Sequence, residues 1–533
     1  MLKRLITLLS RCIALATLLA ASAHVLAAAD APRPGGTLTA IVQPEPTAMT
    51  SGINNTYANG VVSSNIFDGL VTYDKDFNPQ PSLATSWETS ADGLTITFHL
   101  RHGVKWHDGV PFTAADVKFS LEEVWKKLHA RGRVTFAAVR EVQTPDDYTV
   151  VLKLDHPSPV IFSAVNAVEA QILPRHLYAG TDIATNPHNV KPIGTGPFRF
   201  KEWQRGQFIA LEKNPDYWEA GKPLVDKLVF RIIPDAASRS AALETGEVLY
   251  APYNPVPLAD VQRLKALPDL AVDTHGYEWQ ASFYFIEFNL RRPELANLKV
   301  RQAIAHAIDR KGLIDTVWYG FGKPADSPIV SAVTRFHAPD LPQYNFDPAK
   351  AEQLLDAAGY PRQADGVRFR ITLDHQPFND TFANTDEYIR QNLKRVGIDA
   401  TVRNQDLPTF LRKVYGDYDF DINGGQFSGY SDPQMGVLRQ YSSKTIKAGI
   451  PWVNASNYRN PKMDEVIEAI QAQGDGPQRV ASFHEFQRIA QADLPVFPLF
   501  EMRNFSVYSK RLGGVSQAPD GALSSLKNVW LKP

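Results

Sequence analysis

Three histidines that lie close together offer the first chemistry to consider, because imidazole nitrogens are common ligands of transition metals. His99, His102 and His107 surround the turn-forming residues Gly103 and Gly109. In a β-strand, residues 99 and 102 point to opposite faces, so both cannot reach one ion without a bulge. We therefore expect surface histidines beside turns, and no metal site at this position.

Other patterns that could support catalysis are each incomplete. Residues 194–197 (GTGP) lack the third glycine of a dinucleotide-binding loop, and the proline removes a backbone N–H donor. Residues 524–527 (SSLK) match the spacing of a serine nucleophile without its companion motifs. Acidic pairs such as Glu465 and Glu468 are more typical of solvated helix faces than of acid and base catalysts. We expect no enzyme activity and no cofactor or metal.

The first 29 residues predict export. Lys3, Arg4 and Arg11 precede an apolar run at residues 12–20, and the small residues 27–29 (AAA) follow. This is the order of a secretory signal peptide, and we expect cleavage near Ala29. Cys12 raises the alternative of a lipoprotein, but Arg11 stands where processing requires a small residue, and the apolar run follows the cysteine. The mature chain would contain no cysteine, which fits a bacterial periplasm.

Composition restricts the class of protein. The chain has 533 residues, of which 44% are hydrophobic and 21% are charged, as in ordinary soluble globular proteins. Cleavage would remove three of the 56 basic side chains and leave 57 acidic ones, for a net charge of about −4. Nothing is basic enough to predict nucleic-acid binding, and no later stretch has 18 uninterrupted apolar residues.

Strand patterns and helix patterns alternate along the chain and predict an α/β architecture. Residues 37–42, 95–100, 149–154 and 208–211 have the alternation or β-branched content of strands. Thr113 is placed to cap a helix through residue 128, with Asp116 in its first turn. Longer helices follow from about residue 294, at 299–313, 348–358, 386–396, 463–473 and 478–493. The change of pattern at 280–294 is the best candidate for a domain boundary.

Aromatic residues are concentrated in two segments that glycines or turns interrupt. Residues 283–288 (FYFIEF) are apolar on both faces, which predicts a strand buried on both sides, with Tyr277 and Trp279 at its mouth. Residues 424–430 (GGQFSGY) follow a second strand pattern. Aromatic residues more often fill a core than line a ligand site, so both interpretations stay open.

Several long motifs, in order along the chain, resemble the family 5 extracellular solute-binding proteins, the dipeptide and oligopeptide receptors of ABC importers. The first hallmark comprises residues 81–87 (PSLATSW), 92–98 (DGLTITF) and 100–117 (LRHGVKWHDGVPFTAADV). The second comprises 192–198 (PIGTGPF), 214–218 (NPDYW), 221–223 (GKP) and 225–226 (VD), and the third comprises 300–304 (VRQAI) and 307–310 (AIDR). The resemblance extends from about residue 36 to the C-terminus.

This resemblance implies the two-lobed α/β fold of type II periplasmic binding proteins, with an extra subdomain in the first lobe. We expect lobe I to comprise residues 36–75, 192–282 and 500–533. The extra subdomain would be 76–191 and lobe II would be 283–499. The histidine-rich stretch would then lie in the extra subdomain, away from the cleft between the lobes. Ligand contacts that exist only in the closed state would stabilise closure of the hinged lobes.

The resemblance also implies ligand-binding residues. Peptide receptors of the family have an aromatic residue, two small residues and an aspartate for the peptide α-ammonium, whereas residues 427–430 here read FSGY. Tyr430 thus takes the place of the aspartate, and Asp432 matches the next acidic position unless the alignment has a short gap. No arginine lies between Lys413 and Arg439, so the stretch provides no partner for a ligand carboxylate. The predicted ligand-binding residues are Gln43, Trp279, Gln426, Phe427, Tyr430 and Asp432.

Two interpretations of this segment remain. Phe427 and Tyr430 could stack on a ligand, or the glycines could turn the chain while Tyr430 fills the interface between the lobes.

The implied function is a periplasmic, monomeric receptor that captures a peptide or peptide-sized solute and delivers it to the membrane subunits of an ABC permease. The alternative is the same role for a non-peptide solute, such as an opine, a sugar, an aromatic compound or a metal chelate. A receptor that signals occupancy to a sensor is a further possibility.

Overall fold

The computed structural model describes residues 32–515 and 518–533. The predicted signal peptide, residues 1–29, lies outside the described residues. Within the described ranges, no helix combines the length and the apolar character needed to cross a membrane.

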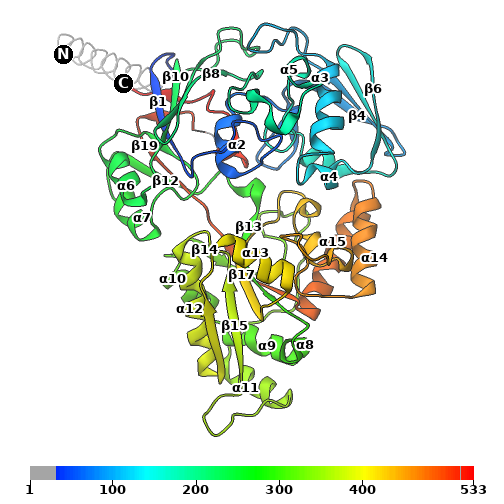
Figure 1. The fold of residues 1–533 in the computed structure, drawn as a ribbon, viewed down its shortest axis with the longest axis vertical. Coiled ribbons are helices and arrows are strands. Elements are labelled where there is room, and N and C mark those ends of the chain that lie inside the picture. Colours follow the sequence, from blue (N-terminus) through cyan, green and yellow to red (C-terminus); the bar gives the residue numbers. More distant parts are fainter. Residues whose placement is uncertain (1–31, 516–517) are drawn as a thin grey trace, which may run out of the picture.

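A seven-stranded mixed sheet forms the upper body in Figure 1, which we call lobe I. Its strand β1 pairs in parallel with β10, from Thr37 opposite Lys227 to Val42 opposite Ile232. Segments from the start, the middle and the end of the chain therefore share one sheet. Its order is β12 (Leu270–Asp273), β19 (Ser506–Ser509), β11 (Tyr250–Ala251), β1 (Thr37–Val42), β10 (Lys227–Ile232), β9 (Phe208–Lys213) and β8 (Phe198–Gln204).

The extra subdomain is a four-stranded antiparallel sheet beside lobe I, at the upper right of Figure 1. Its order is β4 (Ala84–Thr89), β5 (Thr95–Leu100), β7 (Thr149–Leu154) and β6 (Val139–Asp146). One continuous hydrophobic core contains Leu38 and Leu228 of lobe I together with Ile96 and Leu152 of this sheet. Because the two sheets share a core, we expect the extra subdomain to move with lobe I as one body.

A six-stranded mixed sheet forms lobe II, the lower body in Figure 1. Its order is β14 (Gly322–Pro324), β18 (Val496–Met502), β13 (Ser282–Phe288), β17 (Ile422–Ser428), β15 (Phe369–His375) and β16 (Ile398–Arg403). Every residue of β13 is buried. Tyr284 and Ile286 belong to one core, and Phe283 and Phe285 belong to another on the opposite face. The prediction of a strand buried on both sides is confirmed.

Helices cover both faces of the lobe II sheet, and their caps explain where they begin. Asp347 and Asn379 each accept a backbone hydrogen bond at a helix N-terminus, from Lys350 and Phe382 respectively. The helices of lobe II are α8 (Pro293–Ala296), α9 (Leu298–Ala307), α10 (Arg310–Thr316), α11 (Pro348–Ala357), α12 (Asp380–Arg395), α13 (Leu407–Leu411), α14 (Pro461–Ala472) and α15 (Pro477–Asp493).

Three of the predicted helices differ from those observed. The helix expected at 299–313 is divided, because Ile308 is extended and Asp309 caps a new helix by accepting from the N–H of Gly312. The helix expected at 386–396 starts six residues earlier, after its Asn379 cap. The helix that follows Thr113 is α-helical over α3 (Ala114–Phe119) and continues as a π-helical segment, Ser120–Trp125. Asp116 lies in the first turn after Thr113, as predicted, and accepts from the N–H of Thr113.

Smaller elements complete lobe I and the extra subdomain. Lobe I carries α2 (Tyr57–Ser63), α6 (Ala236–Glu244) and α7 (Leu258–Lys265), and the extra subdomain carries α4 (Gly132–Thr135) and α5 (Arg175–Tyr178). Two-stranded ribbons pair β2 (Val71–Tyr73) with β3 (Pro79–Pro81), and β20 (Leu512–Gly513) with β21 (Trp530–Leu531).

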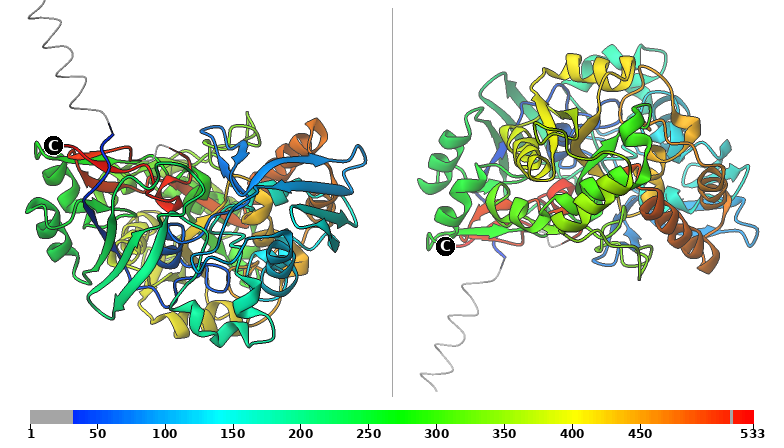
Figure 2. Two further views of the ribbon diagram at one scale, coloured as in Figure 1. Left: turned by 90° about the horizontal axis from the view of Figure 1, so that it is seen from above. Right: turned by 90° about the horizontal axis from the view of Figure 1, so that it is seen from below.

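The chain crosses between the lobes where β13 begins and where β18 ends. We propose that lobe I comprises residues 36–75, 192–282 and 500–533, the extra subdomain residues 76–191, and lobe II residues 283–499. Strand membership supports this division, except that β18 extends lobe II to Met502. In both views of Figure 2, α14 and α15 lie at the end of the molecule that carries the extra subdomain. Lobe II thus meets lobe I and the extra subdomain along one broad interface, which contains the candidate site.

Candidate functional site

The glycine-rich segment forms β17 and leads directly into the interface between the lobes. β17 lies between β13 and β15, with Phe427 opposite Phe283 and Gly425 opposite Phe285. A Cβ on Gly425 would lie 2.2 Å from Cδ of Gln376, whose side-chain Oε1 accepts from the backbone N–H of Gln426. Glycine is therefore required here because the Gln376 side chain lies flat against the strand.

Gln426 makes a direct hydrogen bond to the opposite lobe. Its Nε2 donates to the hydroxyl of Tyr253 in lobe I, at 3.1 Å. The ring of Tyr253 stacks on Tyr57, with 3.7 Å between ring centroids. Gln43, directly after β1, donates from Nε2 to the Tyr253 carbonyl, at 3.2 Å. Two glutamines, one from each lobe, therefore converge on one half-buried pair of tyrosines.

Tyr430 packs into the core of lobe I, although the chain that carries it belongs to lobe II. Its backbone has a φ of +62°, and its N–H donates to the carbonyl of Gln280. The edge of Trp279 meets its ring, with 5.2 Å between centroids. Trp279 is buried and donates from Nε1 to the carbonyl of Ser163 in the extra subdomain. Tyr430 therefore fills the interface between the lobes, as the structural interpretation predicted, and its contact with a ligand stays a prediction.

A buried ion pair of the extra subdomain lies against the same tyrosine. The guanidinium of Arg131 lies 4.9 Å from the centroid of the Tyr430 ring and donates from Nε to Glu169, at 2.7 Å. Burial alone would raise the pKa of Glu169, but the charge and hydrogen bonds of Arg131 outweigh it and hold that pKa below its ordinary value. Glu169 is therefore ionised and fully engaged by Arg131.

Phe427 presents one face to a second arginine. It belongs to the lobe II core and contacts Phe283 and Phe285, and the guanidinium of Arg439 lies 5.0 Å from its ring centroid. Nε of Arg439 is buried and has no hydrogen-bond partner within residues 32–515 and 518–533. Burial and the like charge of Arg131 lower the pKa of Arg439, while Tyr430 acts in the opposite direction. The stretch between Lys413 and Arg439 contains no arginine, but the fold places Arg439, which directly follows it, beside Phe427.

Asp432 is already paired in this structure. It is buried and accepts from the N–H of Gln434 at the start of a short 3₁₀ segment, Pro433–Met435. Its two carboxylate oxygens accept from Arg479 at 3.0 and 2.8 Å. To bind a ligand ammonium group, Asp432 would have to share or leave the buried guanidinium of Arg479.

An open groove of about 700 Å³ borders the interlobe site. The extra subdomain contributes one wall, including Trp87 and Phe162, and lobe II contributes the other, including Phe336 and Asp432. Its volume is within the range of ordinary ligand sites. Its lining includes Ser163, whose carbonyl accepts from Trp279, so the groove borders the packing of Trp279 and Tyr430.

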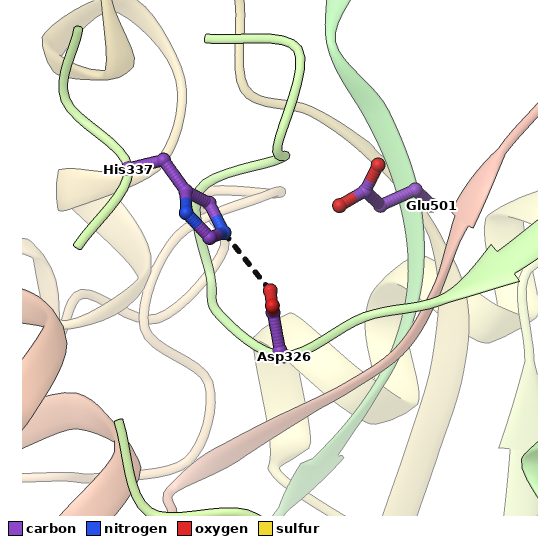
Figure 3. Close-up of side chains that lie close together, drawn as sticks. All are labelled: Asp326, His337 and Glu501. Atoms are coloured by element: carbon purple, nitrogen blue, oxygen red, sulfur yellow. Dashed lines mark hydrogen bonds and ion pairs between the residues drawn. The ribbon is translucent and has the colours of Figure 1, made fainter. Parts of the chain in front are cut away.

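A group of possible metal ligands lies elsewhere in lobe II, and Figure 3 shows its three members. Nε2 of His337 lies 2.9 Å from Asp326, and Glu501 faces this pair. Glu501 accepts from the N–H and the hydroxyl of Ser331, both at 2.8 Å. Because each acidic group already has a protein partner, hydrogen bonding accounts for the arrangement.

The histidines considered from the sequence are separated. His99 and His102 are exposed, as expected, but His107 is buried, and its expected surface position is wrong. Its Nε2 lies 3.0 Å from the carbonyl of Gly196, and its Nδ1 accepts from the N–H of Gly194, at 3.2 Å. The 194–197 loop is therefore a docking site for this histidine.

Sequence reasoning named Gln426, Phe427, Tyr430 and Trp279 as candidate ligand contacts. In the structure Trp279 contacts Tyr430, while Gln426 reaches Tyr253 and Phe427 packs in the lobe II core. Sequence reasoning missed the side chains that arrive from distant segments: Tyr57, Arg131, Glu169, Tyr253 and Arg439. No local signal distinguished them, because an isolated arginine or tyrosine in a loop is usually a surface residue.

Comparisons with known proteins agree with this architecture. Residues 78–448 match the family described as "Bacterial extracellular solute-binding proteins, family 5 Middle". A putative ABC transporter peptide-binding protein of Brucella ovis is 32% identical, over 84% of this chain and 83% of that protein. Oligopeptide-binding protein AppA of Bacillus subtilis is 28% identical, over 94% of this chain and 93% of its own length.

Solved structures show the same fold. The structure of Bacillus subtilis AppA in complex with a nonapeptide has a TM-score of 0.78 and 27% identity, and the match covers 94% of this chain and 100% of that one. AgaA from A. tumefaciens R10, in complex with agropinic acid, has a TM-score of 0.73 and 27% identity, covering 93% and 99% of the two chains. The fold is that of type II periplasmic binding proteins. This chain belongs to family 5 of the bacterial extracellular solute-binding proteins.

Proposed function

We propose that this protein is the exported solute receptor of an ABC importer and holds a peptide or peptide-sized solute between its lobes. The observation that carries this proposal is the convergence of polar and aromatic side chains from both lobes on one interface. Gln426 contacts Tyr253, and Tyr430 contacts Arg131 and Trp279. The names of the peptide-binding relatives support the choice of solute.

Closure of the lobes is the proposed mechanism. Contacts such as the Gln426–Tyr253 hydrogen bond form only when the lobes meet, so a solute that bridges both lobes favours the closed form. The closed form would then be recognised by the membrane subunits of the permease. No covalent chemistry is required. We propose that the receptor acts as a monomer and binds no nucleic acid.

A specific observation favours the alternative of a non-peptide solute. Tyr430 occupies the position where the resemblance leads us to expect the carboxylate that binds a peptide ammonium group. Asp432, the next acidic residue, is held by Arg479. AgaA, bound to agropinic acid, shows that a protein of similar structure takes a non-peptide solute.

Native mass spectrometry of the mature protein, purified from its own periplasm, tests the receptor function by identifying any co-purified solute. Lobe closure can be measured on the same protein by fluorescence transfer between dyes on Lys265→Cys and Lys394→Cys. Both positions are exposed, in lobe I and lobe II respectively, and the only native cysteine is Cys12 in the predicted signal peptide.

A bound solute at a hundredfold excess over its dissociation constant should add about 2.7 kcal/mol to the free energy of unfolding. We expect a co-purified mass and a shorter distance between the dyes. If no solute co-purifies and neither peptides nor opines nor sugars change the dye distance, the receptor function is contradicted.

A further inference from the structure

Arg439 is a charged side chain without a counter-ion inside the interlobe interface. It lies in a short 3₁₀ segment, Leu438–Gln440, and its guanidinium faces the ring of Phe427 at 5.0 Å. Within residues 32–515 and 518–533, this guanidinium makes no hydrogen bond and no ion pair, and its Nε is buried. Arg439 is half-buried as a whole residue, and a cation whose N–H groups are withdrawn from water is ordinarily paired, because desolvation without compensation is costly.

Other buried or partly buried arginines of the chain satisfy this requirement in one of two ways. Arg131 and Arg479 each have a carboxylate partner, Glu169 and Asp432 respectively. A second group lacks a carboxylate but donates to two or more backbone carbonyls: Arg239, Arg301 and Arg310. Arg439 has neither arrangement, which indicates that its partner is not part of the protein.

The charges around Arg439 leave one positive charge in excess. Tyr430 interacts electrostatically with both Arg131 and Arg439, so all three belong to one cluster. Glu169 is the negative member of this cluster, and Arg131 already engages its carboxylate. One further negative charge would neutralise the cluster, and a desolvated site of this kind strongly favours a group that supplies it.

The residues around Arg439 indicate which chemical group of a ligand fits beside it. The face of Phe427 lies on one side of the guanidinium, and Tyr430 is an electrostatic neighbour of it. A planar carboxylate can accept two parallel hydrogen bonds from the fork of a guanidinium while its apolar stem packs against aromatic rings. This geometry selects an organic acid group rather than an ammonium group.

We propose that Arg439 binds a carboxylate of the solute, and that this receptor therefore recognises solutes that carry a carboxylate beside an apolar or aromatic portion. The inference rests on the proposed receptor function and adds the chemical class of its ligand. The carboxylate could belong to a peptide or to a small non-peptide acid such as an opine. Matched acids and amides distinguish these sources.

The test compares binding of acids with that of their amides, in which a neutral amide replaces each carboxylate. The probes are three pairs, each of an acid and the amide made from it: Ala-Ala-Phe and its C-terminal amide, N-acetyl-Ala-Ala-Phe and its C-terminal amide, and octopine and its diamide. Thermal shift and calorimetry are measured for the mature wild type, Arg439→Gln and Arg439→Lys. Arg488→Gln is the matched control, because Arg488 lies on the outer surface of α15 and pairs with Glu485.

We expect at least one acid to bind the wild type more tightly than its amide. Arg439→Gln should lower the affinity for that acid by about 30-fold or more, as expected when one partner of a charge pair is lost. It should leave the affinity for the amide unchanged. Arg439→Lys should retain part of the preference for the acid over its amide, and Arg488→Gln should retain all of that preference. A response to the peptides alone assigns the carboxylate to a peptide, and a response to octopine alone assigns it to a small acid.

Two results would overturn the inference and leave the receptor function standing. One is a solute that closes the lobes and binds wild type and Arg439→Gln equally well. The other is a ligand-free Arg439→Gln protein that melts well below the Arg488→Gln control, which would make the guanidinium structural. The inference also fails if no acid binds more tightly than its amide. The receptor function is tested separately, by the co-purified solute and by lobe closure.

Discussion

Replacement of His107 by glutamine should remove about 2 kcal/mol of the pH dependence of stability between pH 8 and pH 5. His107 is buried between the extra subdomain and the 194–197 loop, and burial lowers its pKa from 6.5 to about 4. Its Nδ1 accepts from the N–H of Gly194, so the neutral ring is the form that fits. A proton on Nδ1 would face that N–H donor.

The sign and the magnitude follow from linkage. Because the pKa of His107 is lower in the folded protein, its contribution is fully present above pH 6.5 and is lost as the pH falls toward 4. One unit of pKa difference corresponds to about 1.36 kcal/mol. At pH 5 the folded form is nearly all neutral and the unfolded form nearly all protonated, which gives a loss of about 2 kcal/mol, rising to about 3 kcal/mol at pH 4.

Urea unfolding at pH 8, 6.5 and 5, monitored by tryptophan fluorescence, measures the effect. The quantity of interest is the difference in unfolding free energy between wild type and His107→Gln at each pH, because the contributions of other titrating groups cancel in it. His102→Gln is the matched control, since His102 is exposed. A difference that stays constant within about 0.5 kcal/mol from pH 8 to pH 5 would refute a neutral, buried His107.

Three further predictions concern polar groups that are buried or lie between the lobes. Asp432→Ala should destabilise the protein by about 3–5 kcal/mol in urea unfolding, because it leaves the guanidinium of Arg479 without a counter-ion, and a cost below 1 kcal/mol would contradict the buried pair. Tyr253→Phe removes the interlobe hydrogen bond to Gln426 and should weaken solute binding by about fivefold in calorimetry, with little change in unfolding; the reverse pattern would show a structural hydroxyl. Glu287, whose pKa burial raises to about 7, favours stability below pH 4.5 and loses that contribution as the pH rises through 7. Glu287→Gln should therefore abolish a fall of about 3 kcal/mol in unfolding free energy over that range, and an unchanged pH profile would count against a buried carboxyl.

The sequence by itself determined the class of the protein and most of its elements. Strand alternation, the helix start at Thr113 and Asp116, and the buried strand at 283–288 depend on neighbouring residues, and local sequence records such preferences. The hallmark motifs indicated the family because they occur together and in order. The export signal was also a prediction from local pattern, and it lies outside the described residues.

Only the tertiary structure decided which side chains meet at the interface. Arg131 and Glu169 arrive from the extra subdomain, Tyr253 from lobe I, and Arg439 from the segment after β17. Asp432 is paired with Arg479, 47 residues away, and His107 with a loop 87 residues away. The physical reason is that burial and charge pairing depend on the packing of lobes and loops, and composition or spacing along the chain does not record that packing.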